Sequence, residues 1–174
     1  MSSFSAFIPT LTEQIDAFFE LAELSESDVV YDLGSGDGRL LFAALEKGAG
    51  KAVGVEFNTE LVCEARKTAG LKGLQDRVTF LKADIMQTDL SEASVIFCYL
   101  SAAACATLKP KFESELKKGA RVVMEFFPVL GWKPLKTIEK DRKRFYLYVM
   151  PPEVSPEDTA SDPLLDYLTY PLSP

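Results

Sequence analysis

The residues best suited to chemistry in this 174-residue chain lie in the segment 29–39, where an apolar run stops at Asp32 and a glycine-rich loop follows. Such an apolar run is typical of a buried parallel strand. Glycine at every second position of the loop permits positive φ and lets a ligand approach the backbone closely. The helix-forming segment 40–46 comes next, so the free N–H groups of a helix start would face that ligand. The segment therefore predicts a strand, a glycine turn and a helix that bind a nucleotide-type cofactor.

The glycine spacing separates two classes of cofactor. A dinucleotide-binding loop has the spacing GxGxxG, whereas the glycines here are Gly34, Gly36 and Gly38, and Arg39 stands where the third dinucleotide glycine is expected. This spacing disfavours NAD. The loop that begins at Asp32 resembles instead the first motif of class I S-adenosylmethionine-dependent methyltransferases. The resemblance implies contacts between S-adenosyl-L-methionine and four residues of the loop: Asp32, Gly34, Ser35 and Gly36.

Two further acidic residues follow apolar segments that read as strands. Glu56 ends the segment 51–56, which comes one helix and one strand after the first acid, and we expect it to reach the ribose hydroxyls. Asp84 lies near the end of the segment 78–85, where the resemblance places an acid that accepts a hydrogen bond from the adenine amine, with Ile85 beside the same ligand. Because ligands of parallel sheets bind at the carboxyl ends of strands, three acids at three strand ends predict one site.

Composition limits the available chemistry. The chain has no histidine, which removes the usual metal ligand and the usual proton acceptor at neutral pH, so we expect no metal. The three cysteines, Cys63, Cys98 and Cys105, lack metal-binding or disulfide spacing and are expected to be reduced core residues. Catalysis is therefore expected to use carboxylates, tyrosine, backbone groups or positioning alone.

Charge and hydropathy restrict the partners and the location. The net charge is −7, and although residues 109–144 carry 11 basic and 5 acidic side chains, residues 1–108 carry 8 basic and 16 acidic ones. An acidic chain of this kind is a poor binder of nucleic acid, so no nucleic-acid partner is expected. No apolar run has the ~20 residues that cross a bilayer, and the first residues lack the basic flank of a signal peptide. We expect a cytoplasmic protein without a membrane partner.

The pattern of apolar residues predicts a single Rossmann-like α/β domain over residues 1–150, with a doubly wound sheet of seven strands that is mostly parallel and ends in an antiparallel hairpin. An acidic, proline-rich tail follows over residues 151–174. The expected helices lie near 11–24, 40–46, 58–69, 101–106 and 110–118. The expected strands lie at 29–33, 51–56, 78–85, 93–99, 120–127, 135–139 and 145–150, with only a brief link over 86–92.

Motifs outside the glycine loop narrow the resemblance. The segments 7–10, 31–39, 119–123 and 131–134 look like those of small archaeal protein-lysine methyltransferases. Mitochondrial enzymes that methylate adenine nucleotide translocase and the c-ring protein of ATP synthase share the pattern. The resemblance implies a methyltransferase that acts on protein substrates with exposed lysines.

Three further roles follow from this resemblance. Pro9 and Thr10 are expected to contact the cofactor as part of a lid. Tyr99 is the candidate catalytic residue, because its hydroxyl could align a neutral lysine amine. Trp132 lines the entrance or, equally, packs in the core of the hairpin.

Two alternatives remain open from the sequence, a methyltransferase for small molecules and a non-catalytic S-adenosylmethionine-binding module. The segment after the fourth strand, 97–101, lacks the Asn/Asp-Pro-Pro-Tyr/Phe motif of enzymes that methylate adenine or cytosine. A compact chain without an inserted substrate domain leaves the cofactor mouth open, which suits a protein substrate. The sequence does not identify the substrate protein, the degree of methylation or the oligomeric state.

Overall fold

One seven-stranded sheet forms the centre of the computed structural model, which describes residues 12–154. The helices are α1 (Thr12–Ala22), α2 (Arg39–Glu46), α3 (Thr59–Leu71), the 3₁₀-helix η1 (Ile85–Gln87) and α4 (Ala102–Glu115). The strands of the main sheet are β1 (Val29–Leu33), β2 (Lys51–Glu56), β3 (Val78–Lys82), β4 (Val95–Cys98), β5 (Arg121–Glu125), β7 (Lys136–Lys140) and β8 (Lys143–Val149). A separate two-stranded sheet pairs β6 (Trp132–Lys133) with β9 (Glu153–Val154).

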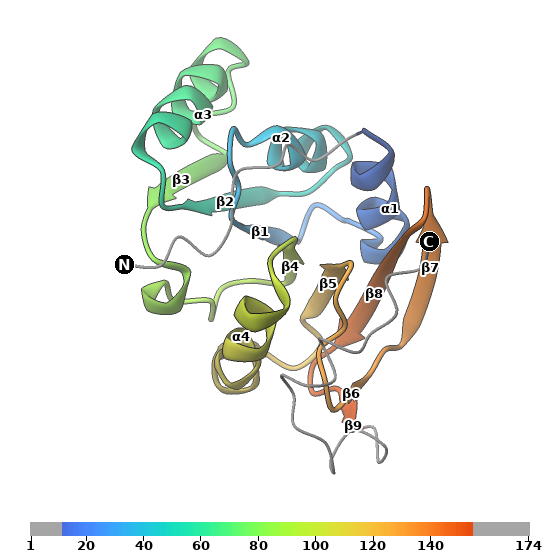
Figure 1. Ribbon diagram of the computed structural model, residues 1–174. Coiled ribbons are helices and arrows are strands. Elements are labelled where there is room, and N and C mark those ends of the chain that lie inside the picture. The colour runs from blue at the N-terminus through green and yellow to red at the C-terminus, as the bar shows by residue number, and fades with distance from the viewer. Residues whose placement is uncertain (1–11, 155–174) are drawn as a thin grey trace.

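The strand order of the main sheet is β3-β2-β1-β4-β5-β8-β7. β1 to β5 are parallel, whereas β8 runs antiparallel to both of its neighbours, β5 and β7. This arrangement confirms the predicted doubly wound, Rossmann-like sheet with an antiparallel end. The chain builds outward from β1 to β3 and then returns to build from β4 in the opposite direction, so the carboxyl ends of β1 and β4 flank the point where ligands bind in such sheets (Figure 1).

Helices cover both faces of the sheet (Figure 1). α1, α2 and α3 pack on one face, where Phe18 of α1 lies with its ring centroid 4.9 Å from that of Phe97 and 5.4 Å from that of Phe145. α4 packs on the other face together with η1. The connection between β3 and β4 contains only η1, which agrees with the predicted brief link.

α4 is one continuous helix, which corrects the prediction of two helical pieces at 101–106 and 110–118. Pro110 lies inside it and cannot donate a hydrogen bond to the carbonyl one turn earlier. The helix continues because Leu108 and Phe112, on either side of the proline, are both buried in the same core. Tertiary packing thus outweighs the local cost of the proline.

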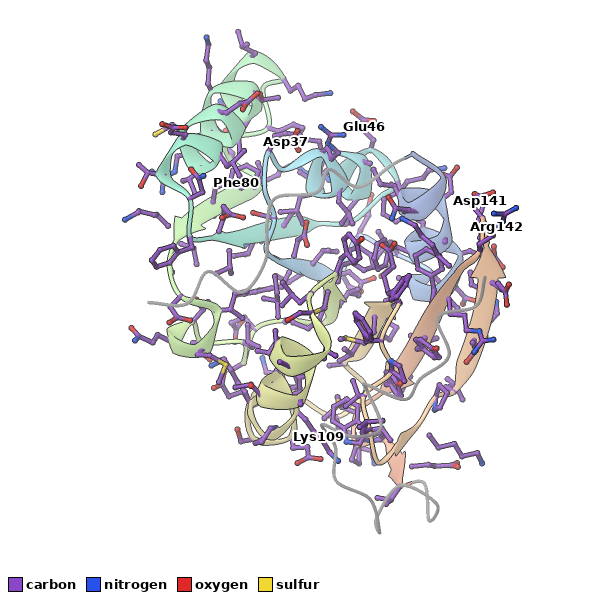
Figure 2. The ribbon with its side chains drawn as sticks, in the orientation of Figure 1. Asp37, Glu46, Phe80, Lys109, Asp141 and Arg142 are labelled. Carbon is purple, nitrogen blue, oxygen red and sulfur yellow. The ribbon has the colours of Figure 1, made fainter. Side chains whose placement is uncertain are left out.

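The last two strands of the main sheet form the predicted hairpin. Asp141 and Arg142 make its turn with φ values of 51° and 62°, as a two-residue hairpin turn of the type with positive φ at both positions requires, and both lie at the tip of the hairpin (Figure 2). β9 continues the fold past residue 150, because Lys133 on β6 pairs with Glu153 on β9 at 2.9 Å. This small sheet was not predicted.

The cysteines divide into two groups. Cys98 and Cys105 are buried, as predicted, but Cys63 is exposed, so the prediction of three core cysteines is wrong for this residue. Cys63 lies on α3 between Val62 and Ala65, which are the residues that turn into the core. The 3.6-residue period of the helix therefore places its thiol on the solvent side.

Candidate active site

The loop between β1 and α2 lies against the end of β2. The amides of Gly34 and Ser35 both donate to the carbonyl of Val55, with N···O distances of 2.8 and 3.1 Å. Gly34, Gly36 and Gly38 have φ values of 94°, 53° and 82°, a region that strains residues with side chains. The alternating glycines thus let the chain leave β1 and turn into α2, as the sequence predicts.

Close approach also requires glycine at two places around this loop. A Cβ atom at Gly38 would lie 2.4 Å from Cζ of Phe80, and one at Gly54 would lie 2.6 Å from Cδ1 of Phe80 and 2.5 Å from Oγ of Ser35. Phe80, on β3, also packs against Phe42 of α2 with ring centroids 5.7 Å apart (Figure 2). Sequence reasoning missed Gly54 and Phe80, although a glycine inside a strand is itself a signal of close approach.

The three predicted acids lie at the carboxyl ends of β1, β2 and β3. Asp32 is in β1 beside its last residue, Glu56 ends β2, and Asp84 follows β3 by two residues. The Glu56 carboxylate joins two segments: its Oε2 accepts from the amide of Gly36 at 3.1 Å, and its Oε1 accepts from the amide of Asn58 at 2.7 Å. β2 is thereby tied to the glycine loop through one side chain.

Asp84 shapes the short link after β3. Its Oδ1 accepts from the amide of Met86 at 2.9 Å, and its carbonyl accepts from the Thr88 hydroxyl at 2.9 Å, so the residue caps η1. Ile85, the first residue of η1, is half-buried against the core on the α4 side of the sheet. Both residues therefore lie at the carboxyl edge where the sequence places them.

Asp32 is held in an unfavourable electrostatic environment. Its side chain is buried, and burial raises the pKa of its carboxyl from the ordinary 3.8 to about 7, with Glu56 and Asp37 adding to the increase as nearby negative charges. Asp37 is itself paired with Arg39, at 2.6 Å between Oδ2 and Nη2. Hydrogen bonds from Arg39 lower the pKa of Asp37 below its usual value despite its own burial. A cation beside Asp32 would thus find a group poised to ionise.

The remaining predicted cofactor residues divide into described and undescribed ones. Pro9 and Thr10 lie outside the described residues. Ser35 is buried within the glycine loop, and its Oγ has no hydrogen-bond partner among residues 12–154. A buried hydroxyl without a partner is unusual in proteins and indicates a site at which a further group belongs.

The chemistry of these groups fits S-adenosylmethionine. The edge offers three carboxylates, which accept hydrogen bonds from hydroxyls and amines and attract positive charge. The glycine backbone allows close approach, and the Ser35 hydroxyl is available as a donor. A ligand with a ribose diol, an adenine amine, an amino group and a sulfonium supplies the matching donors and charge.

Tyr99 follows β4 at the same edge and is half-buried. The Nζ of Lys143, from β8, lies 5.6 Å from the centroid of its ring. The same Nζ lies 3.2 Å from Oε1 of Glu125, the last residue of β5. Sequence reasoning missed Glu125 because a single acid at a strand end gives no sign of its burial.

Trp132 does not line an entrance. Its ring is buried beside Phe112 of α4 and Tyr148 of β8, with centroids 6.3 and 5.4 Å away. Its indole N–H donates to Glu113 at 2.9 Å. The structure therefore selects the second of the two predicted roles, a core residue, because the indole bridges a helix and the sheet.

A family model described as the ANTKMT methyltransferase domain matches residues 32–136. The chain belongs to this methyltransferase family. It is 38% identical over 149 residues to a protein-lysine N-methyltransferase of Saccharolobus islandicus, and the match covers 83% of this chain and 92% of that relative. Family membership confirms the expected class, an S-adenosylmethionine-dependent methyltransferase.

Further relatives of this methyltransferase are longer proteins. It is 34% identical to the adenine nucleotide translocase lysine N-methyltransferase of mouse over 67% of its own length and 51% of the relative. It is also 34% identical to the human lysine N-methyltransferase that is named for the c-ring protein of ATP synthase, over 74% of its own length and 54% of the relative. The chain therefore spans about half the length of these two relatives.

A solved structure matches the methyltransferase in shape as well as in sequence. It is described as an RNA methyltransferase from Salinibacter ruber in complex with S-adenosyl-L-homocysteine, and it is 35% identical with a TM-score of 0.81 over 87% of this chain and 99% of that one. The match agrees with the predicted fold and cofactor class. Among residues 12–154, no helix of the methyltransferase is both long enough and apolar enough to cross a bilayer.

Proposed function

We propose that this methyltransferase transfers the methyl group of S-adenosylmethionine to lysine amines of proteins. The observation that carries the proposal is its similarity, over nearly the whole length of the relative, to an archaeal protein-lysine N-methyltransferase. The names of the mouse and human relatives support the same acceptor. An acceptor edge that already accommodates a lysine side chain between Tyr99 and Glu125 is consistent with it.

The carboxyl edge supplies the groups that would hold the cofactor. Glu56 accepts hydrogen bonds from the ribose hydroxyls and Asp84 from the adenine amine, while Asp32 places negative charge beside the cationic part. The backbone of Gly34, Ser35 and Gly36 lines the ligand, Ile85 packs against it, and Pro9 and Thr10 cover it. When bound, the cofactor supplies a methyl carbon attached to a positive sulfonium. The protein orients that carbon and excludes water from it.

Tyr99 aligns the acceptor in this proposal. Its hydroxyl accepts a hydrogen bond from the neutral lysine amine and directs the lone pair toward the cofactor. Tyr99→Phe should therefore lower kcat while cofactor affinity stays unchanged, because the ring and its packing remain. Calorimetry with S-adenosylhomocysteine measures the affinity, and equal losses in both quantities would count against this role.

RNA is the second candidate acceptor, because the similar Salinibacter ruber protein is described as an RNA methyltransferase. Electrostatics favours protein: the net charge is −7, and the site edge carries Asp32, Glu56 and Asp84. A phosphate backbone would be repelled by such an edge, whereas a lysine ammonium would be attracted.

We further propose that the protein works in the cytoplasm, without a nucleic-acid or membrane partner. All three cysteines of the chain are free thiols in the structure. This state suits a reducing compartment.

Residues 151–174 act, in this proposal, as an acidic segment that attracts lysine-rich proteins. A chain shortened to residue 154 keeps β9 and so tests the charge alone. It should bind cofactor normally but methylate proteins more slowly, with a flatter dependence on salt. Unchanged rates and salt dependence would refute the role.

Labelled S-adenosylmethionine and a cell extract test the acceptor class. After incubation, protein, RNA and small molecules are separated and the label in each fraction is counted. We expect label in protein that protease releases and nuclease does not. The Glu56→Ala variant, which has a weakened cofactor site, is the control for other methyltransferases in the extract. Label in RNA alone, or in small molecules alone, would overturn the proposal.

A further inference from the structure

Glu125 is a buried carboxylate that the cofactor site does not use. Its side chain has no exposed surface, although it ends β5 at the carboxyl edge of the sheet. Its Oε1 receives both the side-chain amide of Gln14, from α1, and the Nζ of Lys143, from β8. Its Oε2 is buried and has no hydrogen-bond partner among residues 12–154. A buried carboxylate with one oxygen unsatisfied is costly, which calls for a reason other than stability.

The surroundings of Glu125 already hold a lysine side chain. Lys143 keeps 27% of its side chain exposed, yet its Nζ reaches Oε1 of Glu125 at 3.2 Å. On the way it lies over the ring of Tyr99, 5.6 Å from the centroid. A carboxylate and an aromatic face are the groups that bind an alkylammonium ion. Lys143 thus shows that a lysine entering from the surface fits between Tyr99 and Glu125.

The backbone directly after Glu125 is strained. Phe126 has a φ of 72°, and the amide of Phe127 donates to the carbonyl of Glu125 at 2.9 Å, so the three residues form a γ-turn with positive φ. A bulky residue in this conformation costs on the order of 1–3 kcal/mol. The amide of Phe126 donates to the carbonyl of Arg144 at 2.8 Å, which holds the turn against β8. The turn fixes where β5 ends and hence where Glu125 stands.

The sheet register brings this pair to the cofactor edge. Asp32 is paired with Phe97 across β1 and β4, and Phe97 with Val123 across β4 and β5. Tyr99 and Glu125 each follow these partners by two residues, which places them on the same face of the sheet, one step nearer its carboxyl edge. β4 lies between β1 and β5, so the two candidate sites are neighbours (Figure 1).

We infer that Glu125 is the carboxylate that receives the ammonium group of the acceptor lysine beside the ring of Tyr99, and that Lys143 occupies this place until a substrate lysine displaces it. The inference rests on the proposed function and names the residue that recognises its substrate. Glu125 is then a catalytic residue, since it contacts the reacting nitrogen.

Recognition and deprotonation follow from the same contact. Burial raises the pKa of the Glu125 carboxyl, and Lys143 and Gln14 lower it without cancelling that effect. Inside such a site an ammonium N–H bond breaks and its proton forms an O–H bond with the carboxylate, which leaves the lysine nitrogen neutral with a free lone pair. The proton passes to water when the methylated lysine leaves as a cation. Charge and protons therefore balance over one turnover.

Two variants that break the same ion pair distinguish this role from a structural one. Glu125→Gln removes the receiving charge and should raise the apparent KM for protein lysines, lowering kcat/KM at least about tenfold. Lys143→Met removes the internal competitor and should lower the apparent KM instead. If the ion pair were only structural, both variants would change kcat/KM in the same direction, and that result would overturn the inference. Lys136→Met, which removes an exposed lysine of the neighbouring strand β7, should leave KM unchanged.

A binding measurement separates this site from catalysis. The probe is n-butylammonium, which has the carbon chain and charge of a lysine side chain, with n-butanol as the neutral control. Saturation-transfer NMR on the enzyme loaded with S-adenosylhomocysteine should show transfer to n-butylammonium, a stronger signal with Lys143→Met and none with Glu125→Gln. Transfer that is absent from the wild type, or equal in Glu125→Gln, would contradict the inference.

The same experiments separate failure of the inference from failure of the proposed function. Wild-type methylation of lysines that Glu125→Gln leaves unchanged would overturn the inference and leave the function standing. Methyl groups found only on RNA would overturn both. Circular dichroism of each variant confirms that the fold is intact, and Lys143→Met, at a partly exposed position, provides a test in which loss of folding is not expected.

Discussion

Cofactor binding should release a proton from Asp32. In the free protein, burial raises the pKa of this carboxyl to about 7, and Glu56 and Asp37 add to the increase. No opposing cation acts on it among the described groups that set its pKa. A bound ligand with a positive sulfonium and an amino group supplies that cation. The pKa of Asp32 should then fall well below neutrality, because a nearby positive charge favours the ionised form.

The size of the effect follows from the pKa. With a value of about 7, the free protein carries about 0.9 proton on Asp32 at pH 6, about 0.5 at pH 7 and about 0.1 at pH 8. If Asp32 is fully ionised in the complex, binding releases these same fractions. Affinity linked to this group should accordingly rise from pH 6 to pH 8 by about tenfold.

Titration calorimetry in buffers of different ionisation enthalpy measures the released protons directly. The cofactor has an amino group that also titrates, so the Asp32→Asn variant is measured under the same conditions and its proton count is subtracted. Asparagine keeps the shape of the side chain but cannot ionise. The difference between the two proteins should be near 0.9 proton at pH 6 and should vanish toward pH 8.

Two outcomes would refute this reasoning. A proton count that is the same in both proteins at pH 6 would show that Asp32 is already ionised in the free protein. A count that differs but grows from pH 6 to pH 8 would assign the titration to another group. Either result would remove the electrostatic argument for Asp32 as the acid beside the cofactor's positive charge.

Other parts of the site give further expected outcomes. Glu56→Ala should weaken cofactor binding by roughly 1.5 to 3 kcal/mol, measured by calorimetry, and unchanged affinity in a folded variant would exclude its role. Gly38→Ala should lower the melting temperature, because its Cβ would lie 2.4 Å from Cζ of Phe80 and its φ is 82°; the exposed substitution Gly73→Ala has a φ of 67° but nothing within 4 Å and should cost less. Asp32→Asn should stabilise the free protein at pH 8 by up to a few kcal/mol but not at pH 4, because a raised folded pKa means that stability is lost as pH rises from about 4 toward 7. A thiol reagent should label Cys63 alone in the native protein and all three cysteines after denaturation.

Local signals explain why the cofactor edge was predictable. The glycines of the loop need positive φ, and only glycine adopts it without strain, so their spacing alone indicated the turn. The acids follow apolar strands, and parallel strands place their carboxyl ends together, so Glu56 and Asp84 were found from order along the chain.

The parts that were missed depend on contacts between distant segments. Glu125 gains its meaning from Gln14 on α1 and Lys143 on β8, which no local pattern connects to it. α4 stays continuous through Pro110 because of packing that a propensity argument does not include. The pairing of β6 with β9 likewise joins segments about twenty residues apart whose sequences carry no strand signal.

The central claim is that lysine amines of proteins accept the methyl group. Mass spectrometry of protein substrates treated with the enzyme and S-adenosylmethionine carrying a deuterated methyl group tests it most directly, because each transferred group is mapped to one residue. We predict the deuterated label on lysine Nζ atoms, lost with Glu56→Ala. Label on carboxylates or cysteines, or proteins without label while RNA or small molecules carry it, would contradict this claim.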